Sequence, residues 1–101
     1  DIHFILWYKM YMSHKNGKEY ITTQEAYKIL ADYFQLTNEQ RNYLTQSGEN
    51  DWEARVRSSY NYLKKKGVIE SASRGEWALT KKGIELFEEM FPPKIIFRNS
   101  I

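Results

Sequence analysis

Basic, amide and hydroxyl side chains suited to nucleic-acid contacts recur at helical spacing between Asn50 and Gly67. At about 100° per residue, five of them share one face: Arg57, Ser58, Asn61, Lys64 and Lys65. Arginine can bond guanine or phosphate in a bidentate manner, asparagine can bond the edge of adenine, and lysine supplies charge to phosphates. A solvated helix end whose lysines complement the helix dipole explains the same pattern. The face is therefore a candidate DNA-contacting surface, with a purely structural alternative.

Position within the helix separates the candidates by role. The first turns of a recognition helix reach deepest into the major groove. Asn50, Arg57 and Ser58 are therefore the candidates for base contacts, and Lys64 and Lys65 are candidates for affinity.

The opposite side of this helix is apolar and is predicted to pack on the domain. Its members are Trp52, Val56, Ser59, Tyr60 and Leu63. Asn50 or Asp51 is predicted to cap the helix start, and Gly67 to end it in the left-handed conformation. Trp52 lies in the first turn, where a large aromatic side chain belongs either to the core or to the DNA surface. Arg55, at the edge of the buried face, is expected to pair with an acidic neighbour.

A β-hairpin is predicted after this helix. Residues 68–72 and 76–79 are rich in apolar and β-forming side chains, and Ser73, Arg74 and Gly75 between them fit a tight turn. Arg74 and Ser73 at the tip are candidate DNA contacts, Arg74 to a phosphate or in the minor groove. The alternative is that Arg74 is an ordinary turn residue. Trp77 in the second strand is predicted to pack on the helices, and the alternative is that it stacks on a base.

The rest of the chain is predicted to position these residues. Residues 2–13 are apolar almost all round, as in a helix enclosed by the domain or by a partner chain. Residues 19–22 can add an edge strand to the hairpin. A second helix is predicted to about residue 35, capped by Thr22 or Thr23, with this apolar stripe: Ala26, Ile29, Leu30, Tyr33 and Phe34.

Two further helices complete the predicted domain. Thr37 and Gln40 have capping-box spacing and predict a short helix to about Thr45. Thr80 is predicted to cap a last helix to about Met90. A helix, turn and basic helix followed by a hairpin is the arrangement of a winged helix, so we predict an α+β fold of this type over residues 1–91.

Charge is concentrated where these motifs lie. The whole chain has a formal net charge of only +2, with 15 Lys/Arg and 13 Asp/Glu. Residues 51–75 hold six Lys/Arg and three Asp/Glu, whereas residues 1–50 hold five and six. A local positive excess of this kind is typical of a nucleic-acid footprint. The modest net charge of the whole chain instead favours a protein-interaction module.

Several enzyme classes lack their motifs in this sequence. It contains no cysteine, and its two histidines, His3 and His14, have no metal-site spacing. There is no glycine-rich phosphate loop, no Gly-x-Ser-x-Gly elbow, and no Asp-x-Lys or Glu-x-Lys triplet. We therefore expect neither a cofactor nor catalysis by these residues alone. The longest apolar stretch, residues 2–12, is too short to span a bilayer.

The run Ser73-Arg74-Gly75-Glu76-Trp77-Ala78-Leu79-Thr80, the later Gly83, and the segments 23–26, 36–41 and 63–69 resemble the N-terminal domain of Mrr-type restriction proteins. The resemblance covers most of residues 2–91. It implies a winged-helix module that binds double-stranded DNA, in some members carrying methylated or otherwise modified bases. It also implies that residues 92–101 are a linker to a nuclease domain. Ser58 departs from the family, which commonly has Trp near the middle of the basic helix.

Two other functions remain open from the sequence. The aromatic first helix or the last helix can serve a homodimer or another protein contact without DNA. A transcriptional regulator would share the DNA contact but have no nuclease partner. A cytoplasmic location is the default expectation for each of these proteins.

Overall fold

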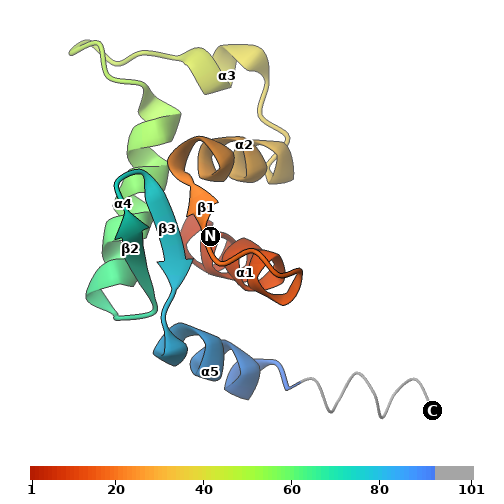
Figure 1. Ribbon diagram of the computed structural model, residues 1–101. Helices are drawn as coiled ribbons and strands as arrows, with labels where there is room; N and C mark the ends of the chain where they lie inside the picture. The colour runs from red at the N-terminus through yellow and green to blue at the C-terminus, as the bar shows by residue number, and fades with distance from the viewer. Residues whose placement is uncertain (93–101) are drawn as a thin grey trace.

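The computed structural model describes residues 1–92, which form an α+β fold, as predicted (Figure 1). Its elements are α1 (Ile2–Lys15), β1 (Ile21–Thr22), α2 (Thr23–Tyr33), α3 (Asn38–Asn42), α4 (Asp51–Lys65), β2 (Ile69–Ser73), β3 (Glu76–Leu79) and α5 (Lys81–Met90). The linker predicted over residues 92–101 lies outside the described residues except for Pro92. No helix within residues 1–92 is long and apolar enough to cross a membrane.

Side-chain caps start the helices at the predicted residues. Thr22 and Thr37 each form a capping box, with Glu25 and Gln40 respectively. The Asn50 carboxamide oxygen accepts from the Glu53 backbone N–H, 3.0 Å away, at the start of α4. Such caps satisfy amides that have no partner inside the helix. The sequence therefore placed the starts of these helices correctly.

The ends of two helices differ from the prediction. α2 ends at Tyr33, two residues early, because Gln35 adopts a φ of +55°. α3 ends at Asn42 instead of about Thr45. The reason is that Tyr43 becomes extended and its carbonyl accepts from the Asp51 backbone N–H, 3.0 Å away. The chain after α3 thus pairs with the start of α4.

Gly67 ends α4 as predicted. It has a φ of +79°, its N–H donates to the Lys64 carbonyl, and the next N–H, of Val68, donates to the Leu63 carbonyl. These two bonds are the Schellman arrangement, which needs a left-handed residue at this point. They turn the chain directly from α4 into β2.

The three strands form an antiparallel sheet in the order β1-β3-β2. The predicted edge strand is shorter than expected, since only Ile21 and Thr22 pair with β3. The hairpin turn is docked rather than protruding, because the Gly75 carbonyl accepts from the Thr23 backbone N–H at 3.0 Å. Figure 1 shows the turn at the same end of the sheet as the start of α2.

The core lies between α1, α2, α4 and the sheet. Its largest fully buried side chains are Leu6, Ile21, Leu30, Val56 and Ile69. The predicted apolar face of α4 is buried throughout. Trp77 is only 5% exposed and stacks on Tyr60 with ring centroids 4.2 Å apart, which confirms its structural role. Tyr33, by contrast, was placed wrongly in the buried stripe of α2, because 47% of it is exposed.

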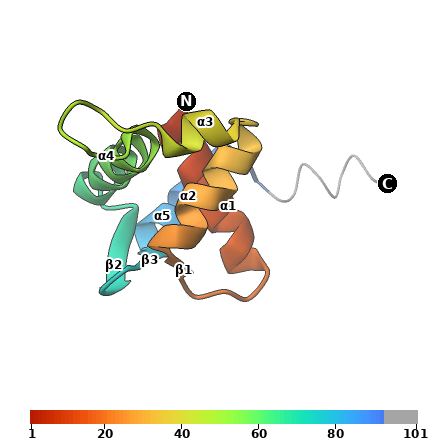
Figure 2. The same cartoon turned by 90° about the horizontal axis from the view of Figure 1, so that it is seen from above.

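Helices α3 and α5 lie at opposite ends of the molecule (Figure 1). The loop between α3 and α4 extends past α4 at the edge of the molecule (Figure 2). α5 packs mainly on α1 through stacked rings, with the centroids of Tyr11 and Phe87 4.3 Å apart. Helices α1 and α2 both contact α4, whose buried side chains are those of its apolar face.

Candidate nucleic-acid interface

The face of α4 predicted to contact DNA points away from the core. Ser58, Asn61, Lys64 and Lys65 are exposed, and Arg57 is half-buried. We call these five residues the α4 face. The buried side of the helix holds it against α1 and α2, so its outward side chains have a fixed helical backbone beneath them. This placement leaves four of the five available to a partner.

Ion pairing divides the cations of the described residues into two groups. Six are within salt-bridge distance of a carboxylate: Lys15, Lys18, Lys28, Arg41, Arg55 and Arg57. Within residues 1–92, the cations without such a partner are Lys9, Lys64, Lys65, Lys66, Arg74, Lys81 and Lys82. All of these except Lys9 lie between the last turns of α4 and the first turn of α5. Four of the seven unpaired cations lie in residues 51–75, the segment that carries the positive excess, and two more follow it at the start of α5.

Arg57 is held by three neighbours. Its Nη1 donates to the Tyr27 hydroxyl at 3.0 Å and lies 3.9 Å from the Glu53 carboxylate, and its Nη2 donates to Glu49 at 3.3 Å. The hydrogen bond to Tyr27 is the main cause that raises the pKa of the Arg57 guanidinium, followed by the two carboxylates. Contact between Arg57 and a nucleic acid must therefore compete with, or be oriented by, these bonds.

The first turn of α4 is acidic. Asp51 and Glu53 lie in it, Glu49 precedes it, and Asp51 Oδ2 pairs with Arg55 Nε at 3.1 Å, as expected for that arginine. Acidic side chains stabilise a helix start because they complement the helix dipole. They also repel phosphates, so a polyanion meets opposite potentials at the two ends of this helix.

The side chains of Asn50 and Trp52 make hydrogen bonds within the domain. Besides capping α4, Asn50 donates from Nδ2 to the Arg41 carbonyl at 2.9 Å. Trp52 is 8% exposed, and its indole N–H donates to the Tyr27 carbonyl at 3.0 Å. Of the two readings of Trp52, the structure places it in the core, because α2 and Phe34 cover it. Each side-chain nitrogen and oxygen of these two residues thus has a hydrogen-bond partner within the domain.

The two candidate residues at the hairpin tip differ in whether their side chains already have a partner. Arg74 is exposed and has no ion-pair partner among residues 1–92. Ser73 is also exposed, but its hydroxyl donates to the Glu76 carboxylate across the turn. Arg74 is therefore the available group at the tip, and Ser73 stabilises the turn.

Sequence reasoning missed Tyr27 and Glu49, the residues that hold Arg57. Tyr27 is thirty positions from Arg57 and mostly buried, so no local pattern connects them. Glu49 lies in a loop without periodicity. A signal for Glu49 was its position directly before the predicted cap, Asn50, which places it at the start of the helix that carries Arg57.

No group of three or more His, Asp or Glu side chains is placed to hold a metal ion within residues 1–92. Comparison with protein families matches residues 10–89 to the Mrr N-terminal domain. This match covers most of the chain, so the protein belongs to the Mrr N-terminal domain family. Searches of curated proteins and of solved structures gave no match.

Proposed function

We propose that this chain is a winged-helix domain that binds double-stranded DNA, with α4 in the major groove and the β2–β3 turn on the adjacent backbone or minor groove. The observation that carries the proposal is the set of unpaired cations Lys64, Lys65 and Arg74, with exposed Ser58 and Asn61 on the same helix face as the lysines. Unpaired cations neutralise phosphates without first breaking an ion pair. Exposed hydroxyl and amide groups can bond base edges.

Family membership supports the wider setting of this proposal. We propose that the domain is the target-recognition module of an Mrr-like restriction protein in the cytoplasm, joined through residues 92–101 to a nuclease domain of the PD-(D/E)XK kind. The catalytic groups would then belong to that domain and not to residues 1–92. Recognition of a methylated base is the finer proposal.

We assign each candidate residue a proposed contact from its exposure and its partners within the domain. Lys64, Lys65 and Arg74 are the proposed phosphate contacts. Ser58 and Asn61 become the first candidates for base contacts, since Asn50 and Trp52 serve the fold. Arg57 remains a candidate, with its guanidinium held by Tyr27.

The test measures fluorescence anisotropy with short duplexes, unmethylated or carrying methylated cytosine or adenine, across a salt series. The Lys64→Ala/Lys65→Ala double variant is expected to weaken binding to all duplexes and to reduce the salt slope by about 0.9 per lost phosphate contact. The matched control, Lys9→Ala/Lys81→Ala, removes the same charge from unpaired lysines elsewhere and should keep most of the slope. Equal losses in both double variants would show that only net charge matters.

The same duplexes test the finer proposal. A domain that reads a modification should prefer one modified duplex by about tenfold or more, roughly 1.4 kcal/mol. If Arg57 contacts a base, Arg57→Ala costs about 1–3 kcal/mol on that duplex and little on the others. Uniform loss would make Arg57 a phosphate contact. Absence of binding to every duplex at low salt overturns the DNA proposal.

A second candidate function is self-association, which an aromatic groove favours. Phe4, Tyr8, Tyr33, Phe87 and Phe91 line a groove of about 360 Å³ between α1, α2 and α5. Met90 and Phe91 beside it are 52% and 50% exposed. We propose that a homodimer through α1 and α5 covers this surface.

A further inference from the structure

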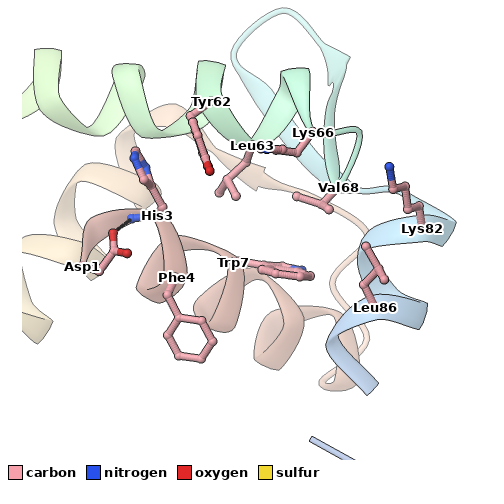
Figure 3. A pocket seen from close by; sticks show the side chains of 10 residues that line it. All are labelled: Asp1, His3, Phe4, Trp7, Tyr62, Leu63, Lys66, Val68, Lys82 and Leu86. Carbon is pink, nitrogen blue, oxygen red and sulfur yellow. Dashed lines mark hydrogen bonds between the residues drawn. The ribbon is translucent and has the colours of Figure 1, made fainter. Parts of the chain in front are cut away.

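A second concave site lies on the side of the molecule where α1, the last turns of α4 and the start of α5 meet. The pocket has a volume of about 350 Å³ and shares no residue with the α4 face. Figure 3 shows His3 and Tyr62 at one end, Lys82 and Leu86 at the other, and Trp7 between the two ends. Small-molecule sites occupy roughly 300–1,000 Å³, so this pocket has room for a small ligand.

The walls of this pocket are mostly apolar. They are formed by side chains of Phe4, Trp7, Leu63, Val68 and Leu86. The indole N–H of Trp7 donates to the Gly83 carbonyl at 3.0 Å, so this donor already has an acceptor within the protein. The wall can therefore bury an apolar group without leaving this donor unpaired.

Two lysines give the pocket its charge. Lys66 and Lys82 line it, are exposed, and have no ion-pair partner among residues 1–92. Lys82 lies against the turn that directly follows Lys66, since a Cβ built on Gly67 would lie 3.6 Å from Lys82 Cδ and 3.7 Å from its Nζ. Asp1 also lines the pocket, and its carboxylate accepts a hydrogen bond from the His3 backbone N–H at the start of α1.

An aromatic stack extends this site toward the start of α1. The His3 and Tyr62 rings are stacked with centroids 4.3 Å apart, and Lys66 Nζ lies 5.4 Å from the Tyr62 centroid. His3 Nδ1 is buried with no hydrogen-bond partner among the described residues. A buried polar atom without a partner is uncommon in folded proteins, and here it belongs to a residue of the pocket wall.

We infer that this pocket binds a small amphipathic anion, with its apolar body against Trp7 and Leu86 and its carboxylate, sulfonate or phosphate group at Lys66 and Lys82. The apolar wall excludes a fully hydrated inorganic ion as the best ligand, because such an ion leaves that surface uncovered. The two unpaired ammonium groups favour an anion over a neutral or cationic ligand. Binding at this pocket requires no DNA.

The test uses the 101-residue protein and the fluorescent probe 8-anilinonaphthalene-1-sulfonate, with N-phenyl-1-naphthylamine as its uncharged analogue. The sulfonate is expected to bind more tightly than the neutral analogue, and more weakly as salt rises. Competition by decanoate would indicate an aliphatic ligand, and competition by indole-3-acetate an aromatic one. In proton–nitrogen NMR spectra the indole signal of Trp7, assigned with Trp7→Phe, should shift more than those of Trp52 and Trp77.

Neighbouring lysines give a matched control. Lys66→Ala/Lys82→Ala should weaken sulfonate binding about four- to twenty-fivefold, because an exposed ion pair contributes roughly two- to fivefold per lysine. Lys65→Ala/Lys81→Ala removes the same charge beside the pocket and should change binding less than twofold. Equal effects of the two double variants overturn the inference, as does a failure of the sulfonate to bind. A shift of the Trp52 or Trp77 signal in place of Trp7 would place the probe elsewhere and also overturn it.

Discussion

Replacing Gly83 with alanine tests how closely α5 packs on the rest of the domain. A Cβ built at Gly83 would lie 2.0 Å from the Val68 carbonyl oxygen. That oxygen accepts from the Thr80 backbone N–H at 3.0 Å, so it cannot turn away without losing a bond. The start of α5 must therefore move by about 1 Å or more to restore ordinary contact distances. Such a movement would also disturb the bond from Trp7 to the Gly83 carbonyl.

Helix propensity and the close contact at Gly83 predict opposite changes in stability for Gly83→Ala. Gly83 lies inside α5, where alanine would otherwise be favoured by about 1 kcal/mol. Forcing extra atoms into a packed site costs about 1–3 kcal/mol and occasionally more, and here the obstacle is backbone. We expect Gly83→Ala to lower the free energy of unfolding by about 2 kcal/mol, which lowers Tm by about 8–16 °C for a domain of this size.

Urea denaturation followed by tryptophan fluorescence measures this change. Gly75→Ala is a suitable control, because Gly75 has a φ of +76° but no atoms within 4 Å of its built Cβ. Gly75→Ala should lower the free energy of unfolding only by the cost of holding alanine in the left-handed conformation, about 1–2 kcal/mol. A Gly83→Ala variant as stable as the wild type, or more stable, would refute the close packing of α5 on Val68.

Two further predictions concern pH and self-association. The hydrogen bond from Lys18, followed by that from the Thr22 backbone, lowers the pKa of Glu25. A carboxyl whose pKa is lowered on folding stabilises the fold above its unfolded pKa of about 4.3, and this stabilisation is lost as pH falls through the folded value. Glu25→Gln should therefore reduce the loss of stability below about pH 4, measured by thermal melts from pH 3 to 7; an unchanged profile would exclude the contribution. Sedimentation equilibrium should show a dimer that Phe91→Asp dissociates, whereas Leu44→Asp, at an equally exposed leucine far along the chain, leaves it intact; a monomeric wild type would exclude the dimer.

The sequence predicted most of the fold because its signals were local. Capping residues such as Thr37 and Thr80 need only the amides of the next turn, and Gly67 needs only its own backbone conformation. The buried and exposed sides of α4 followed from helical periodicity alone. Boundaries failed where a distant partner decided them, as when α3 ended early so that Tyr43 could pair with Asp51.

The candidate site was less predictable because its groups are shared with the fold. Type and position alone do not distinguish an asparagine that caps a helix from one that contacts a base. Asn50 can do either, and the bond from its Nδ2 to the Arg41 carbonyl depends on how α3 packs. Trp52 was ambiguous for the same reason, since its donor finds an acceptor only after α2 is placed beside α4.

The net charge of a segment conceals how that charge is arranged. Residues 51–75 carry an excess of three positive charges, yet α4 begins with Asp51 and Glu53 and ends with Lys64 and Lys65. The same gradient complements the helix dipole at both ends and so stabilises the helix without any ligand. Helix stability alone does not require that the lysines be unpaired, because a carboxylate one turn earlier would stabilise the helix further. Within residues 1–92, Lys64 and Lys65 have no such carboxylate, a feature that helix stability leaves unexplained and that the proposed DNA partner would explain.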